Sequence, residues 1–168
     1  MATYLQTLKE TFADPSEALR IRRKDVNGNI VTINFPVKGH YPGPVKVSNK
    51  LIGMLDSLPK TSELFFPTTY GVTHSTYNRM RKRCAHIHQN PRILSIELRT
   101  FRHWGGSMLA HYTNGNVLKV KQILRHKRVD STMKYIQMLN LEDDDFEVTS
   151  ATTPDEIKKL QGRLDKIR

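Results

Sequence analysis

The apolar positions near the N-terminus recur with the spacing of an α-helix. Within residues 2–12 they lie three and four positions apart, at Leu5, Leu8 and Phe12. A second helix is predicted to start at Pro15, because Asp14 is a good N-cap and Glu17 stands where a capping box needs an acid. Its inward positions are predicted to be Ala18, Leu19 and Ile21, and its basic positions are expected to point mostly outward: Arg20, Arg22, Arg23 and Lys24.

The pattern then changes to the alternation that is typical of β-strands. Asn27-Gly28-Asn29 is a turn signal, and residues 30–35 alternate as a strand does. A turn rich in proline and glycine, residues 39–44, leads into a second strand at residues 45–47. These strands are predicted to form a small antiparallel sheet, with Lys38 at the tip of the hairpin.

Most of the remaining chain is predicted to be helical. Ser48 can cap a helix over about residues 49–57, and Asn90-Pro91 ends a basic helix over residues 75–88. Further helices are predicted at residues 98–112, 116–125 and 130–139, followed by a short strand at 146–149 and a last amphipathic helix that opens at 153–156. The predicted fold class is therefore mainly α with a small antiparallel β-sheet (α+β).

The length of 168 residues fits one domain, predicted as residues 1–140, with a C-terminal appendage at residues 141–168. Cys84 is the only cysteine, so an intramolecular disulfide cannot form and a reducing compartment is the simplest setting. Neither a membrane-spanning apolar run nor a secretory signal is present, so we expect a soluble, cytoplasmic protein. The histidines lack companion ligands at metal-binding spacing, so no metal site is expected: His86, His88, His103 and His111.

The charge of the chain is uneven and points to a polyanionic partner. Residues 76–135 hold 13 basic and 2 acidic residues, whereas residues 136–168 hold 5 basic and 8 acidic ones. Such a basic surface favours contact with DNA phosphates over a merely solvated helix face. The predicted DNA-contacting residues are Arg79, Arg81, Lys82, Arg83, Arg20, Arg23, Lys127 and Arg128.

Three polar residues in the C-terminal half carry the candidate chemistry. His126 follows Arg102 by 24 positions, and Tyr135 follows His126 by 9. A tyrosine hydroxyl that attacks phosphorus needs fixed positive charge at the phosphate and help with its proton. Taken singly, Tyr135 is more simply a half-buried helix tyrosine and His126 a surface or capping histidine, so the combination carries the argument.

These residues lie in segments that resemble the signature boxes of tyrosine recombinases, the phage integrase family. The matching segments occur in the same order over residues 12–140 and include 16–19, Asp25, the strand pair with Lys38, 102–104, 122–126 and 131–135. The residues around 36–40 and 101–104 are most similar to integrase-like proteins of archaea and their mobile elements. The resemblance implies the catalytic-domain fold of that family and site-specific cleavage and rejoining of double-stranded DNA by DNA-bound tetramers. It also implies a 3′-phosphotyrosyl intermediate, without a cofactor or metal.

The resemblance assigns a role to each candidate catalytic residue. Tyr135 would be the nucleophile, Arg102 a phosphate clamp, and His126 a phosphate contact or proton handler. Lys38 would be the general acid for the leaving 5′-oxygen. Arg99 stands where the family usually has a histidine; its cation could hold phosphate but could not serve as a base.

Asp14 departs from the family pattern, because it stands where the first catalytic arginine is expected. A carboxylate beside a phosphate repels it. Either a nearby arginine supplies the missing charge, with Arg20, Arg22 and Arg23 as the candidates, or the protein is a catalytically impaired DNA-binding module derived from the same fold. A topoisomerase-like enzyme that relaxes DNA by the same chemistry is a third hypothesis.

Overall fold

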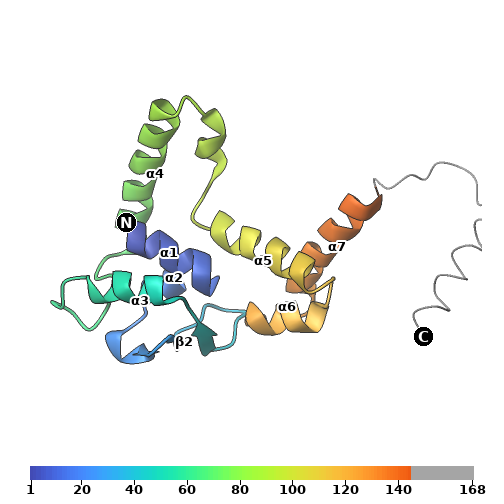
Figure 1. Ribbon diagram of the computed structural model, residues 1–168, viewed down its shortest axis with the longest axis horizontal. Coiled ribbons are helices and arrows are strands. Elements are labelled where there is room, and N and C mark those ends of the chain that lie inside the picture. Colours follow the sequence, from blue (N-terminus) through green and yellow to red (C-terminus); the bar gives the residue numbers. More distant parts are fainter. Residues whose placement is uncertain (145–168) are drawn as a thin grey trace, which may run out of the picture.

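The computed structural model describes residues 1–144, which form a mainly helical protein with one small antiparallel sheet, as predicted (Figure 1). The sheet has three strands, because residues 26–27 add a short strand to the predicted pair. In chain order the elements are α1 (Ala2–Thr11), α2 (Pro15–Ala18), the 3₁₀ helix η1 (Arg23–Asp25), β1 (Val26–Asn27), β2 (Ile30–Ile33), β3 (Gly43–Lys46), α3 (Asn49–Asp56), α4 (Tyr70–Ile87), the 3₁₀ helix η2 (Pro91–Ser95), α5 (Thr100–Tyr112), α6 (Val117–Ile123) and α7 (Asp130–Asp144). The predicted strand at residues 146–149 and the helix that opens at 153–156 lie outside the described residues. No helix within residues 1–144 is both long and apolar enough to cross a membrane.

Two hydrophobic clusters hold the described residues together. The larger one joins α1, the sheet and α3 through fully buried side chains that include Leu8, Val31, Ile33, Leu51 and Leu55. The smaller one joins α5, α6 and α7 through Ala110, Val120, Leu124 and Tyr135. Phe12, at the end of α1, packs against the smaller cluster, so the polar residues between α1 and α5 lie at the junction of the two cores.

The second helix is shorter than predicted. Asp14 caps it and forms the predicted capping box with Glu17, but α2 ends at Ala18. The backbone beyond it pairs with a distant segment instead: Phe65 N–H donates to Ile21 O and Arg23 N–H donates to Glu63 O. The long-range hydrogen bonds satisfy the backbone groups after Ala18 in place of helical ones. Helix propensity is a weak preference, so these tertiary contacts override it.

The sheet is a meander of three short strands in the order β1-β2-β3. Gly28, at φ +53°, makes the turn between β1 and β2, as its turn signal predicts. Ile33 pairs with Gly43, so the intervening loop of residues 34–42 carries Lys38. β3 begins before the predicted residue 45 and includes Pro44, which is tolerated because β3 is an edge strand.

α4 and η2 form an arm that projects from the rest of the protein (Figure 1). α4 begins at Tyr70, earlier than the predicted residue 75, because the Thr69 side chain caps it. It ends before Asn90-Pro91, as predicted, and the Asn90 side chain then caps η2. The Tyr77 hydroxyl, 2.8 Å from Ile96 O, ties the arm to the approach to α5.

Candidate active site

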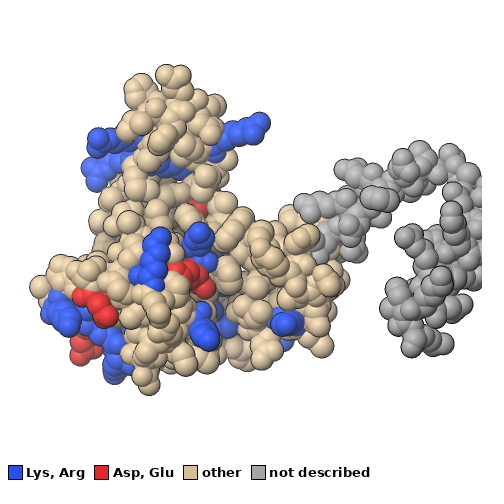
Figure 2. All heavy atoms as spheres, viewed as in Figure 1, with Lys and Arg blue, Asp and Glu red and all other residues tan. Residues whose placement is uncertain are grey.

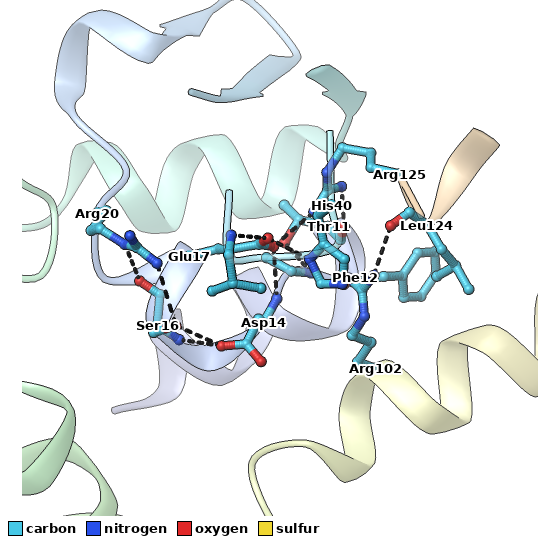
Figure 3. A network of polar contacts seen from close by, with 12 residues as sticks. Thr11, Phe12, Asp14, Ser16, Glu17, Arg20, His40, Arg102, Leu124 and Arg125 are labelled. Carbon is cyan, nitrogen blue, oxygen red and sulfur yellow. Dashed lines mark hydrogen bonds and ion pairs between the residues drawn. The ribbon is translucent and has the colours of Figure 1, made fainter. Parts of the chain in front are cut away.

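Glu17 is the centre of a buried polar network (Figure 3). Its carboxylate accepts four hydrogen bonds: from Asp14 N–H (2.9 Å), Val37 N–H (3.1 Å), His40 Nδ1 (2.6 Å) and Arg125 Nη2 (3.0 Å). Burial alone would raise the pKa of Glu17, but these hydrogen bonds and the charge of Arg125 lower it to about 2. Glu17 is therefore an anion at neutral pH, and its ion pair holds the guanidinium of Arg125 in place.

Arg102 reaches this network from α5. Its guanidinium is buried and donates to Phe12 O, to Leu124 O at 2.7 Å and to His40 Nε2 at 3.0 Å. His40 can accept this hydrogen bond only as the tautomer that donates from Nδ1 to Glu17. A chain of hydrogen bonds from Glu17 through His40 therefore orients Arg102.

Arg125 brings a second buried guanidinium to the same place, although it was not among the predicted site residues. Its backbone is left-handed, at φ +59°, which turns the side chain back under the sheet loop. Nη2 bonds Glu17 Oε2 at 3.0 Å and Nη1 bonds Thr11 O at 3.3 Å. Arg125 thus brings a second guanidinium to the site, paired with the Glu17 carboxylate, which offsets much of its charge.

The three arginines considered as substitutes for the missing charge are engaged elsewhere. Arg20 is exposed, and its Nε donates to Ser16 O at 3.0 Å. Arg22 stacks on Phe35, and Arg23 donates to backbone carbonyls of the loop that precedes α4. Among the described residues none of the three donates to Glu17, and Arg20 reaches only the edge of the network, through the Ser16 hydroxyl, which donates to Asp14.

The two departures from the family pattern lie opposite each other. Arg99 Nε is 3.7 Å from Asp14 Oδ2. The Arg99 side chain is largely exposed, so this ion pair contributes at most about 1 kcal/mol to stability. Its effect is electrostatic: the carboxylate at position 14 is partly neutralised by the cation at position 99.

Tyr135 is buried against α5, with only 2% of its surface exposed. Its ring lies on Gly106, where an added Cβ would come within 2.5 Å of the ring. It also stacks on the ring of His126 (centroids 6.4 Å apart, interplanar angle 12°), and its hydroxyl is 3.1 Å from His103 Nδ1. Burial raises the pKa of Tyr135, although Arg102 opposes this, so the hydroxyl keeps its proton at rest.

His126 lies between Tyr135 and His40 and is buried. Its Nδ1 is 2.9 Å from Thr132 Oγ1. Burial, together with nearby charged groups of which Arg102 is the first, lowers the pKa of His126 to about 3. His126 is therefore neutral at pH 7 and is available as a hydrogen-bonding group rather than as a cation.

The loop that carries Lys38 is pinned to the segment that carries His126. Tyr41 N–H donates to Arg125 O at 2.7 Å and Lys127 N–H donates to Gly39 O at 2.8 Å, on either side of a bridge between His40 and His126. Lys38 is exposed, two residues from His40. The antiparallel bridge holds this lysine at the edge of the site.

The residues predicted to contact DNA differ in how free their side chains are. On the arm, Arg79, Lys82 and Arg83 are exposed, whereas Arg81 donates to Ile96 O. Figure 2 shows Lys and Arg side chains on both sides of this arm. Lys127 lies over the Tyr41 ring, and Arg128 pairs with Asp130 at 2.9 Å. Within residues 1–144 no group of three or more histidine, cysteine or acidic side chains is placed to hold a metal ion.

The neutral state of His126 predicts a loss of stability in mild acid. The unfolded state takes up a proton near pH 6.5, whereas the folded state, with a pKa of about 3, does not. The free energy of unfolding therefore falls as the pH drops from 7 to 5. The loss is about 2 kcal/mol, because pH 5 lies 1.5 units below the unfolded pKa of 6.5 and each unit costs about 1.4 kcal/mol. Glu17 adds nothing in this range, because its carboxylate is ionised in both states. Urea unfolding at both pH values should show a smaller loss for His126→Gln than for wild type and His111→Gln; equal losses in all three would contradict the assignment.

The contact between Gly106 and Tyr135 predicts that Gly106→Ala destabilises the protein. A methyl group there must displace the Tyr135 ring, which costs about 1–3 kcal/mol of overpacking. Gly53 on α3 is the matched control, since nothing lies within 4 Å of its added Cβ and alanine there should stabilise the helix by up to about 1 kcal/mol. Urea unfolding measures both changes. If both variants gain stability, Tyr135 does not pack on Gly106 in solution.

No protein-family model matches the sequence, and no curated protein matches it. Solved structures do resemble the fold. The XerA recombinase is 16% identical over 88% of this chain, with a TM-score of 0.59, and the Tn1549 transposon integrase in complex with transposon right end DNA is 13% identical over 97%, with a TM-score of 0.67. The XerH site-specific recombinase in a post-cleavage complex with palindromic difH substrate is 18% identical over 85%, with a TM-score of 0.64. The matches cover 58%, 58% and 44% of those chains, so this chain spans about half the length of these recombinases.

At these identities the likeness shows the fold. The helices and the small sheet match the catalytic domain of tyrosine recombinases, which confirms the predicted fold class.

Proposed function

We propose that the chain is the catalytic domain of a site-specific tyrosine recombinase, which cuts and rejoins double-stranded DNA during integration or excision of a mobile element. The observation that carries this proposal is the convergence of Tyr135, Arg102 and His126, from three separate elements, in one buried site. Solved recombinases with the same fold support it, two of those compared being bound to DNA. Assembly as a DNA-bound tetramer is part of the proposal, on the resemblance of the sequence to that family.

In the proposed reaction the Tyr135 oxygen attacks the scissile phosphate, and the bond to the 5′-oxygen breaks. Arg102 and Arg125 supply fixed positive charge as negative charge develops on the phosphate, which stabilises the transition state. Lys38, exposed on its loop, donates a proton to the leaving 5′-oxygen. The phosphotyrosyl bond conserves the energy of the phosphodiester, so the same groups acting in reverse rejoin the strand.

A second candidate function is a DNA-binding module that does not cut. Two observations favour it: Tyr135 is buried, and the Arg102 guanidinium donates to two backbone carbonyls. Both side chains must be released from these contacts before a phosphate can reach them. Two contacts favour activity instead. Arg125, which was not among the predicted site residues, balances the buried Glu17 carboxylate, and Arg99 partly neutralises Asp14.

Covalent trapping tests the proposed function. The protein is incubated with a pool of nicked duplexes of randomised sequence, and denaturant-resistant protein–DNA adducts are recovered, sequenced and digested. The proposal expects an enriched DNA site and a nucleotide on the peptide that contains Tyr135. Binding without any adduct would favour the non-cutting module. Relaxation of supercoiled plasmid without strand exchange would favour the topoisomerase-like alternative.

The exposed basic side chains of the arm predict a strong salt dependence of DNA binding. Neutralising Arg79, Lys82 and Arg83 together should make the negative slope of log affinity against log salt shallower by about 2.7, because each phosphate contact contributes about −0.9 to it. Affinity should fall alike for all duplex sequences. The matched control neutralises three exposed lysines outside the arm: Lys24, Lys50 and Lys60. Equal effects of the two triple variants, measured by fluorescence anisotropy, would show that the arm has no special role.

A further inference from the structure

His103 is the hydrogen-bond partner of the Tyr135 hydroxyl within the described residues, and the role of this histidine is not explained by the fold. Its Nδ1 lies 3.1 Å from the hydroxyl oxygen. His103 and Gly106 are three residues apart on α5 and so share one face of the helix, where Gly106 receives the ring of Tyr135 and His103 receives its hydroxyl. The rest of His103 is exposed to solvent.

The protonation states fix the direction of this hydrogen bond. Burial raises the pKa of Tyr135, so the hydroxyl holds its proton. Partial burial lowers the pKa of His103, as do the charged groups that face it, Arg99 and Arg102 from α5 and Lys134 from α7. A neutral His103 has a free lone pair on Nδ1 if the proton is on Nε2, so the hydroxyl donates and the imidazole accepts.

Other groups near Tyr135 are less suited to accept its proton. His126 stacks on the ring, and its Nδ1 bonds Thr132 rather than the hydroxyl. Arg99, at the position where the resemblance expects a histidine, has no lone pair to offer. His103 lies four residues further along the same helix, about one turn away, and presents the imidazole that position 99 lacks.

We infer that His103 is the general base of strand cleavage, an inference that rests on the proposed function. As the bond from Tyr135 Oη to phosphorus forms and the bond from phosphorus to the 5′-oxygen breaks, the phenolic proton passes to His103 Nδ1, and the 5′-oxygen takes a proton from Lys38. Negative charge on the bound phosphate offsets the cost of an imidazolium beside three cations. In rejoining, His103 returns the proton to the tyrosine oxygen, and its exposed edge lets it exchange protons with water.

Single-turnover adduct formation across pH tests this role. The substrates are nicked duplexes selected from the randomised pool by wild-type protein. Wild type should gain rate with pH until His103 of the DNA-bound protein is neutral, because only the neutral imidazole can accept the phenolic proton. His103→Gln, which keeps an acceptor but no base, should lose about 10²–10³-fold in rate and lose this rise with pH. His111→Gln, an exposed histidine on the same helix, is the matched control and should behave as wild type.

A substrate with sulfur in place of the bridging 5′-oxygen separates the base from the acid. A thiolate leaves without a proton, so this substrate should restore Lys38→Ala and should not restore His103→Gln. Restoration of His103→Gln would mean that His103 serves the leaving group, which overturns the inference.

The tautomer of His103 gives a readout that needs no DNA. Nitrogen-15 NMR of the imidazole in wild-type protein at pH 7 should show a proton on Nε2 and none on Nδ1, and Tyr135→Phe should shift the Nδ1 resonance. A proton on Nδ1 would overturn the inference even if His103→Gln failed to fold.

If wild type forms no adduct, the proposed function fails and the inference with it. If wild type and His103→Gln form the adduct at equal rates with equal pH profiles, the proposed function stands and only the inference fails.

Discussion

Tyr135→Phe is expected to form no covalent adduct with nicked duplex DNA while it binds the same DNA as tightly as wild type. The substitution removes one oxygen and leaves a ring that still packs on Gly106 and still stacks on His126. The lost hydrogen bond to His103 should cost about 1 kcal/mol of stability, too little to unfold a domain. Adduct formation on the selected nicked duplexes, together with anisotropy titration of the same duplexes, measures both properties.

Tyr77→Phe is the matched control for this substitution. Tyr77 is also buried, and its hydroxyl donates a hydrogen bond of 2.8 Å to Ile96 O, so its loss perturbs stability to a similar degree. It lies on the arm, away from the network around Glu17, and adduct formation should persist. An adduct that survives in Tyr135→Phe would assign the nucleophile to another residue.

Glu17→Ala is expected to lower the free energy of unfolding by about 3–5 kcal/mol. The carboxylate is buried and is the ion-pair partner of Arg125, whose side chain is only 4% exposed. Removing it leaves the guanidinium without its counter-charge and two backbone N–H groups, those of Asp14 and Val37, without their acceptor. Urea unfolding at pH 7 measures the change.

Glu10→Ala provides the comparison for the Glu17 result. Glu10 also accepts hydrogen bonds from a backbone N–H and a side chain, both of Ser48, but this site is exposed to solvent, so its loss should cost about 1 kcal/mol. Adding Arg125→Met to Glu17→Ala should recover part of the lost stability, because the unpaired buried charge is then gone. Equal costs for Glu10→Ala and Glu17→Ala would show that water enters the network and screens it.

The elements that the sequence predicts well are those with local end signals. Asp14 and Ser48 cap α2 and α3 as expected, and the Asn90-Pro91 pair follows the end of α4. Each signal acts within three or four residues, through a side chain that bonds a nearby backbone N–H. The spacing of Tyr135, Arg102 and His126 resembles that of a known family, and the structure places the three side chains close together, while their catalytic roles stay a prediction.

The features that could not be predicted depend on contacts between distant segments. α2 ends at Ala18 because the chain that follows it pairs with residues 63–65. Arg125 reaches Glu17 across 108 positions, and only a left-handed backbone directs its side chain there. His40 likewise meets Arg102 across 62 positions. Periodicity and motif spacing carry no information on such contacts, since they are set by tertiary packing.

The hydrogen bonds that join the end of α1 to the buried arginines of the site affect the order in which the protein folds. The hydrogen bonds of Arg102 to Phe12 and of Arg125 to Thr11 close loops of 90 and 114 positions, so the chain loses much entropy before they form. The contact that ties the arm to the approach to α5, from the Tyr77 hydroxyl to Ile96 O, closes only 19 positions. We therefore expect the arm to form early and the site late. During synthesis a nascent chain would present a basic helix to DNA well before residue 135 emerges, so binding capacity would precede the capacity to cut.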